Sequence, residues 1–420
     1  MKRWIVAFLL TVQGLSAIPN TVFGGIVNAQ SPLDGLDLTG PLIAGLRGGE
    51  LPGEWKEESS VAGTRSAYLL ARPLIWGQEA LLVRGLWRDE SLEELQITFN
   101  DAGSFFGYFS AKAPEHLSKR EKEEFFDEQT RVRQEEFTTL HLESLAAIKG
   151  ELEKLADRGK GKSLRFGKSR AIRAEVTEYQ WEGMTARLFH GEERLVRVSL
   201  GKKDALSDQW MDRSLADLDA RSYRQWLQKR ATKEESGDEI LKGVEVVPQG
   251  YRPYCGLNTL VMAGRYLGMH LDEDWLASAG KFKNTGSAAG SQMLSLYGSV
   301  ASEAGLKMKR LNRFEETVMK RSLRAGLPVI VWRRWSSNRD REHSRQTHSF
   351  KQTGKADWGE RSQLVFPDKK APLHASVIVG FNEERREVLF LESWSERQGV
   401  RRMPVEEMKG TAYLTFCFQP

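Results

Sequence analysis

The hydrophobic positions in the first half of the chain predict a β-rich region interrupted by one long helix. Apolar and polar residues alternate over 172–177, and the segment 95–99 is rich in strand-forming residues and followed by turn residues. Between these segments, Ser118 and Glu121 have the spacing of a capping box, and apolar residues recur at helical spacing up to about Ala156. The pattern therefore predicts an antiparallel sheet with one long helix inserted between its strands.

The second half has a different order, with helical patterns first and strand patterns later. Apolar residues at helical spacing predict helices over 255–267, 292–304 and 314–324. Runs of β-branched and aromatic residues predict strands over 328–332, 375–380, 387–392 and 411–418. The polar segment 336–371 has almost no apolar period, and we expect either a lid or a disordered insertion there.

These patterns predict an α+β protein with two domains. The first domain, over 34–205, combines antiparallel strands with the long helix, and the sequence does not indicate its role. The segment 206–240 is expected to be a helical connector, and the second domain covers 241–420. A chain of 420 residues is long enough for two or three domains, which agrees with this division.

The first residues have the pattern of an export signal. Lys2 and Arg3 precede the apolar stretch Trp4–Ile18, which is shorter than the roughly 20 residues that span a bilayer. Small residues up to Ala29 predict cleavage after that residue, so that 1–29 would be a signal peptide. We expect the mature protein to be periplasmic or extracellular, without a stable membrane span. An uncleaved anchor is the alternative.

Composition excludes several other classes of protein. Hydrophobic residues make up 40% and charged residues 28% of the chain, which is typical of a globular protein and excludes a disordered or fibrous one. Two cysteines, Cys255 and Cys417, are too few for a disulfide framework or a cysteine-based zinc module. The net charge of +5 is small for this length and does not indicate nucleic-acid binding. His343 and His348 lack a third ligand, so we expect neither a metal nor another cofactor. The oligomeric state stays open.

A candidate nucleophile lies at the start of a predicted helix. A thiol attacks a carbonyl as thiolate, so it needs a base beside it, a group that orients the base, and donors for the developing oxyanion. Cys255 begins the helix over 255–267, where the helix dipole and the backbone N–H groups lower the pKa of a thiol. Cys417 lies in the last predicted strand and is expected to pack in the core.

Three further residues complete a catalytic set. His374 begins a strand and is the candidate base. Glu392 ends the next strand, which should form a hairpin with the first, and its carboxylate would accept the Nδ1 hydrogen of His374. Gln249 stands six residues before Cys255, and its amide would form an oxyanion hole with the Cys255 backbone N–H. The sequence thus predicts a Cys-His-Glu triad with a glutamine donor.

This set of residues resembles the papain-like cysteine peptidases. In that family a glutamine stands six residues before the nucleophile, and an Asn-Ser-Trp run follows the histidine by one strand, where this chain has Glu392-Ser393-Trp394. The helices-then-strands order also resembles the bacteriocin-leader-processing, or double-glycine, branch of the superfamily. The resemblance covers roughly residues 240–420. It implies a papain-like fold and a thiol peptidase that hydrolyses a peptide or protein substrate through an acyl-enzyme, with Trp394 packed over the histidine and its orienting residue.

The chain departs from the family pattern at two places. Gly256-Leu257 stands where the family has Cys-Trp after the nucleophile, and Glu392 replaces the usual Asn or Asp. Since asparagine serves in the family, we expect that a hydrogen-bond acceptor matters at position 392 and that charge is dispensable. Two alternatives to a peptidase stay open. One is an amide transferase or transpeptidase with the same triad, and the other is an inactive peptide-binding module in which Glu392 is a sign of decay.

Overall fold

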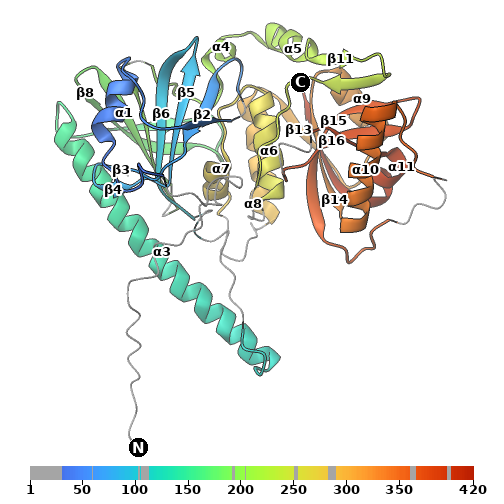
Figure 1. The fold of residues 1–420 in the computed structure, drawn as a ribbon, viewed down its shortest axis with the longest axis horizontal. Helices are drawn as coiled ribbons and strands as arrows, with labels where there is room; N and C mark the ends of the chain where they lie inside the picture. The colour runs from blue at the N-terminus through green and yellow to red at the C-terminus, as the bar shows by residue number, and fades with distance from the viewer. Residues whose placement is uncertain are drawn as a thin grey trace, which may run out of the picture.

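Two antiparallel sheets lie on opposite sides of a group of helices. The computed structural model describes residues 31–58, 60–102, 105, 113–191, 194–203, 205–249, 254–281, 290–359, 366–394 and 399–420. The predicted signal peptide lies outside these ranges. Figure 1 shows the helices α6 (Cys255–Tyr266), α7 (Glu273–Ala279) and α8 (Gly290–Glu303) between the two sheets. The α+β architecture predicted from the sequence is confirmed.

The first sheet has eight strands in the order β1-β2-β5-β6-β10-β9-β8-β7. Its strands are β1 (Trp55–Glu57), β2 (Arg65–Leu69), β5 (Leu82–Arg88), β6 (Ser91–Asp101), β7 (Lys162–Phe166), β8 (Ala174–Trp181), β9 (Met184–Gly191) and β10 (Leu195–Lys202). A short helix, α1 (Thr39–Leu46), and the two-stranded ribbon of β3 (Leu74–Ile75) and β4 (Gln78–Glu79) lie beside this sheet. The sheet matches the prediction of an antiparallel first domain.

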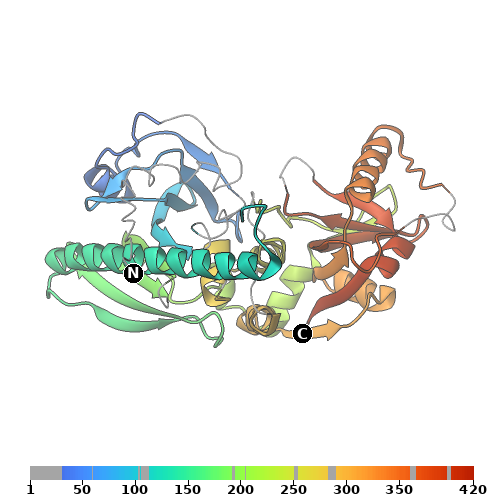
Figure 2. The ribbon, with the colours of Figure 1, turned by 90° about the horizontal axis from the view of Figure 1, so that it is seen from below.

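The long helix α3 (Lys119–Leu155) starts where the capping box predicts. The Ser118 side chain accepts a hydrogen bond from the backbone N–H of Glu121, and the Glu121 side chain accepts one from the backbone N–H of Ser118. Its C-terminal half buries Ile148 and Leu152 against the first sheet, while its N-terminal half carries ion pairs along the helix and extends past the sheet (Figures 1 and 2). Among the described residues, no helix combines the length and the hydropathy needed to cross a membrane.

The second sheet also has eight strands, and β15 is its centre. The path runs β11-β12-β15-β14-β18-β13, and β16 branches from β15 to pair with β17. Its strands are β11 (Ala231–Lys233), β12 (Asp238–Leu241), β13 (Lys307–Leu311), β14 (Val329–Arg334), β15 (Leu373–Asn382), β16 (Glu387–Leu391), β17 (Arg401–Pro404) and β18 (Ala412–Gln419). The helix α9 (Glu316–Arg324) lies between β13 and β14 in the chain. The predicted strand positions agree closely with β14, β15, β16 and β18.

The segment 206–240 is helical only in its first part, so its description as a helical connector was incomplete. It contains α4 (Arg213–Ala216) and α5 (Ala220–Gln228), and then β11 and β12, which join the second sheet. The backbone of β12 comes so close to β15 that a Cβ at Gly380 would lie 2.5 Å from the carbonyl oxygen of Glu239. This close approach depends on a glycine in β15, which no pattern within 206–240 could indicate.

The prediction of a lid or disordered insertion over 336–371 was wrong for its first half. Residues 337–353 form the helix α10 (Ser337–Thr353), and the described end of the segment leads directly into β15. Arg339 and His343 on this helix both bond the carboxylate of Glu407 in α11 (Val405–Thr411). The apolar period was absent because charged and polar side chains fasten this helix to the domain.

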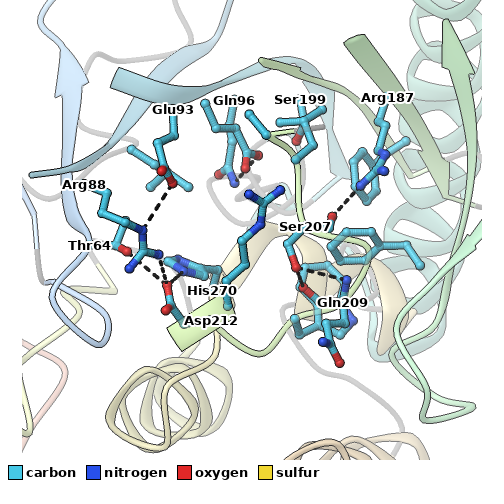
Figure 3. Close-up of a pocket in the computed structure, with 18 of the residues that line it drawn as sticks. Thr64, Arg88, Glu93, Gln96, Arg187, Ser199, Ser207, Gln209, Asp212 and His270 are labelled. Atoms are coloured by element: carbon cyan, nitrogen blue, oxygen red, sulfur yellow. Dashed lines mark hydrogen bonds and ion pairs between the residues drawn. The ribbon is translucent and has the colours of Figure 1, made fainter. Parts of the chain in front are cut away.

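Polar contacts join the two halves at Asp212. Its buried carboxylate accepts hydrogen bonds from Arg88 (2.8 Å) and Thr64 (3.0 Å) of the first domain and lies 2.7 Å from His270 Nε2, which follows α6 (Figure 3). The cavity beside it is lined by charged and apolar residues, among them Arg88, which bonds both Asp212 and Glu93.

A continuous apolar core extends the same junction. Phe189 and Leu195 of the first sheet belong to one buried cluster with Trp275 of α7, and the indole N–H groups of Trp210 and Trp275 both donate to the carbonyl of Ile172. The two halves of the chain therefore have separate sheets but share part of their apolar core.

Candidate active site

Cys255 is the first residue of α6 and is partly exposed. The helix is held in place by the buried residues Leu257, Leu260 and Val261, which form the apolar stripe predicted from the sequence. The Tyr297 hydroxyl donates to the carbonyl of Gly256 at 2.9 Å. The backbone N–H of Gly256, at the start of the helix, hydrogen-bonds the thiol and lowers its pKa. Cys255 thus begins a helix, as the sequence predicts.

His374 lies on β15, and its ring is fixed from two directions. Its Nε2 is 2.6 Å from Oε2 of Glu392. The Trp394 ring stacks on the imidazole, with ring centroids 4.4 Å apart and an interplanar angle of 7°. The predicted packing of Trp394 over the histidine is confirmed. Because the ring cannot rotate out of this stack without losing the Glu392 bond, His374 has one defined orientation.

The structure corrects the nitrogen through which Glu392 acts. Glu392 was predicted to accept the Nδ1 hydrogen of His374, whereas Nε2 makes that bond. The His374 side chain also hydrogen-bonds the Cys255 thiol, and since Nε2 is occupied, Nδ1 is the nitrogen that serves the thiol. Residue order along the chain does not determine which ring nitrogen faces which partner, because this depends on the side-chain torsion angles of the histidine.

Glu392 is buried directly after β16 and is held by more than the histidine. Its Oε2 also accepts a hydrogen bond from the Ser376 hydroxyl at 3.0 Å, and its Oε1 accepts one from the Arg333 guanidinium. Arg333 Nε in turn donates to the Ser376 hydroxyl at 3.1 Å. The carboxylate is therefore shared between two cationic side chains, which is the arrangement that a buried charge requires.

Arg333 and Ser376 were not predicted as site residues from the sequence. Ser376 lies two residues after His374, on the same face of β15, and Arg333 pairs directly with His374 in the β14–β15 register. An arginine inside a strand that is otherwise buried was a signal available in the sequence, because such a charge needs a partner.

These contacts shift the pKa values of the three groups in a consistent way. Burial lowers the pKa of His374, but the Glu392 charge and the hydrogen bond to Cys255 outweigh it and raise that pKa to about 9. Burial raises the pKa of the Cys255 thiol, but the hydrogen bond and charge of His374 outweigh it, so this pKa is lowered. Burial also opposes ionisation of Glu392, and the charges of His374 and Arg333 nevertheless lower its pKa to about 2. The arrangement favours a thiolate beside an imidazolium.

Gln249 lies close to this group through its contact with Ser393. Its backbone N–H donates to the Ser393 carbonyl at 2.8 Å, and its side-chain Oε1 accepts a hydrogen bond from the Ser393 hydroxyl at 2.6 Å. The Gln249 side chain is buried. Since Ser393 follows Glu392 in the chain, both predicted residues are anchored to the same short segment after β16.

Cys417 and His343, the other cysteine and a histidine considered as a metal ligand, both lie outside the candidate site. Cys417 is fully buried in β18, and burial raises the pKa of its thiol to about 11. His343 lies 2.9 Å from Glu407 through Nε2. The described residues contain no group of three or more potential metal ligands.

A comparison with known proteins relates the second half of the chain to a protein family. Residues 241–419 match the model of the Peptidase_C39 like family. This part of the chain is related to the C39-like cysteine peptidases. The match confirms the resemblance to the papain-like superfamily over roughly residues 240–420, and it does not include the first sheet.

Two other comparisons add little to the C39-like assignment. A solved structure of a proposed C39-like peptidase from Bacillus anthracis is 16% identical, covers 43% of this chain and 96% of its own, and has a TM-score of 0.29. A TM-score this low carries no argument about the fold. No curated protein matches the sequence.

Proposed function

We propose that the protein is a thiol peptidase that hydrolyses peptide bonds, with Cys255, His374 and Glu392 as its catalytic triad. The observation that carries the proposal is the unbroken chain of contacts from the Cys255 thiol through His374 to Glu392. The family match over residues 241–419 supports the same class of chemistry. The bonded position of Glu392 also speaks against decay of the site, because the glutamate makes the contact that an orienting residue needs.

In the proposed reaction the Cys255 thiolate attacks the scissile carbonyl carbon and forms a tetrahedral intermediate. Its oxyanion would accept hydrogen bonds from the Gln249 amide and the Cys255 backbone N–H. The imidazolium of His374 gives its Nδ1 proton to the leaving amine, the C–N bond breaks, and a thioester remains on Cys255. His374 then takes a proton from water, and the hydroxide attacks the thioester. The C–S bond breaks, the carboxylic acid product leaves, and the thiolate of Cys255 and the imidazolium of His374 are regenerated.

Glu392 has a separate task in this cycle. It accepts the Nε2 hydrogen of His374 throughout, so Nδ1 keeps facing the thiol while its proton moves. We further propose that the protein is exported through the segment 1–29, and that 34–205 and 241–420 are its two domains. The first domain would act by holding the catalytic domain through the junction at Asp212.

The pH dependence of hydrolysis tests the ion pair. Activity should fall on the alkaline side around pH 9, because the imidazolium with its raised pKa is lost there. On the acid side it should fall only below the pKa of an ordinary thiol, because the thiolate forms at lower pH than usual. The measurement is the initial rate with dye-labelled casein over the acid to alkaline range. A single rise near about pH 8.5, the value of a free thiol, with no alkaline fall, would contradict the proposal.

A further inference from the structure

Arg333 forms a closed group with two residues of the proposed site. It sits opposite His374 in the register of β14 and β15, and only 2% of its surface is exposed. Its guanidinium bonds Glu392 Oε1, and its Nε bonds the Ser376 hydroxyl, which itself donates to Glu392 Oε2. Arg333 therefore reaches the carboxylate that bonds His374 both directly and through the Ser376 hydroxyl.

The buried guanidinium changes what position 392 must contain. Arginine does not lose its proton in proteins, so its charge stays in the site whatever residue faces it. A neutral amide at 392 could still accept the His374 hydrogen, but it would leave the Arg333 charge unbalanced and close to the imidazolium. An uncompensated buried charge is strongly unfavourable, and two neighbouring cations disfavour each other.

The other charged groups near Glu392 do not replace this contact. The charge of Arg401 also acts on Glu392, but the Arg401 guanidinium donates to Asp340 at 2.7 Å. His343, which the charges of Arg333 and Arg401 also reach, bonds Glu407 instead. On the side of the thiol, Tyr297 and Tyr413 are titratable groups of the described residues that interact with Cys255 besides His374.

We propose that Arg333 is a positioning residue that makes a carboxylate obligatory at position 392 and presents its Oε2 to His374. This inference rests on the proposed function of the Cys255 site. It also replaces the expectation from sequence that charge at position 392 is dispensable, since that expectation came from family members judged without regard to a buried arginine.

The test is a double-mutant cycle read by alkylation of Cys255 with iodoacetamide at neutral pH, followed by mass spectrometry of the Cys255 peptide. Glu392→Gln should slow alkylation about tenfold or more, since one pKa unit lost by His374 changes the ion-pair population tenfold. Adding Arg333→Met should restore the rate to within a few-fold of the wild type, because a neutral amide then faces a neutral side chain. Adding Arg333→Lys should not restore it, because the buried charge remains.

The outcomes of this test distinguish a failure of the role proposed for Arg333 from a failure of the proposed function of Cys255. A wild-type Cys255 that is alkylated like an ordinary free thiol would overturn the proposed function itself. If the wild type shows the ion pair, two results would overturn only the role of Arg333. One is alkylation of the double variant that is as slow as in Glu392→Gln or slower, and the other is a double variant that does not fold. If Glu392→Gln alone fails to fold, a folded and reactive double variant still supports the inference.

A matched control is available in the first sheet. Arg84 is 4% exposed, lies on β5 of the first sheet and pairs with Glu58. Arg84→Met should lower the melting temperature, as the loss of a buried charge pair does, and should leave the pH profile of Cys255 alkylation unchanged. A change of that profile in Arg84→Met would mean that the assay reports stability rather than the site, and it would overturn the interpretation of the cycle.

Discussion

Replacing Cys255 by Ala is expected to abolish hydrolysis of dye-labelled casein, with a fall in rate of about 10⁶-fold, comparable to the removal of other catalytic nucleophiles. The reason is that the proposed thioester forms on its sulfur and that no other described thiol contacts His374. The fold should survive, because Cys255 is partly exposed and the helix is held by its apolar face. Initial rates and the thermal unfolding curve of the variant check both expectations.

Cys417 provides the matched control, since it is the other cysteine of the chain. Cys417→Ala removes a fully buried sulfur from β18 and should cost about 1 kcal/mol of stability without changing the rate of hydrolysis. If Cys255→Ala retained activity, or if Cys417→Ala lost it with an intact fold, the nucleophile would be misassigned.

Replacing Gln249 by Ala is expected to lower kcat by about 10²- to 10³-fold, the usual loss for one oxyanion donor. KM should change little, because the oxyanion develops after the substrate has bound. Ser393→Ala, which removes the hydroxyl that donates to Gln249 Oε1, should give a smaller loss in the same direction. Steady-state kinetics on one peptide substrate measure kcat and KM of Gln249→Ala and kcat of Ser393→Ala. Unchanged kcat in Gln249→Ala would mean that Gln249 only anchors the segment after β16.

The sequence predicted those parts of the fold that depend on local patterns. The capping box at Ser118 and the alternation of apolar and polar residues over 172–177 each depend on neighbouring residues. They appear in the structure as the start of α3 and as β8. The same holds for α6, whose apolar face is periodic and whose start was indicated by the position of Cys255. Each of these elements needs only the burial of its own apolar face, which the sequence shows directly.

The parts that the sequence did not predict depend on contacts between distant residues. The helix α10 has no apolar period because Glu407, 64 positions after His343, holds it through charged bonds. β12 joins the second sheet because Gly380 lets its backbone approach. Such partners are far apart in the chain, so no periodicity within either segment contains the information.

The same distinction holds within the candidate site. Cys255, His374 and Glu392 could be chosen because their residue types and their order resemble a known family. The bond through Nε2 and the contribution of Arg333 could not, because both follow from the register of β14 against β15. A register defines which side chains face each other across two strands, and a single sequence does not state it.

The measurement that tests the central claim most directly is the pH dependence of alkylation at Cys255 in the wild type and in His374→Ala. The fully buried Cys417 should stay unalkylated in both, which checks that the fold is intact. Our account predicts that wild-type Cys255 reacts with iodoacetamide at pH values well below the pKa of a free thiol. In His374→Ala the reaction should be much slower at neutral pH and should require alkaline pH, because the cation that stabilises the thiolate is gone. Equal pH profiles for Cys255 in the two proteins would contradict the account, since His374 would then not be the partner of the thiol.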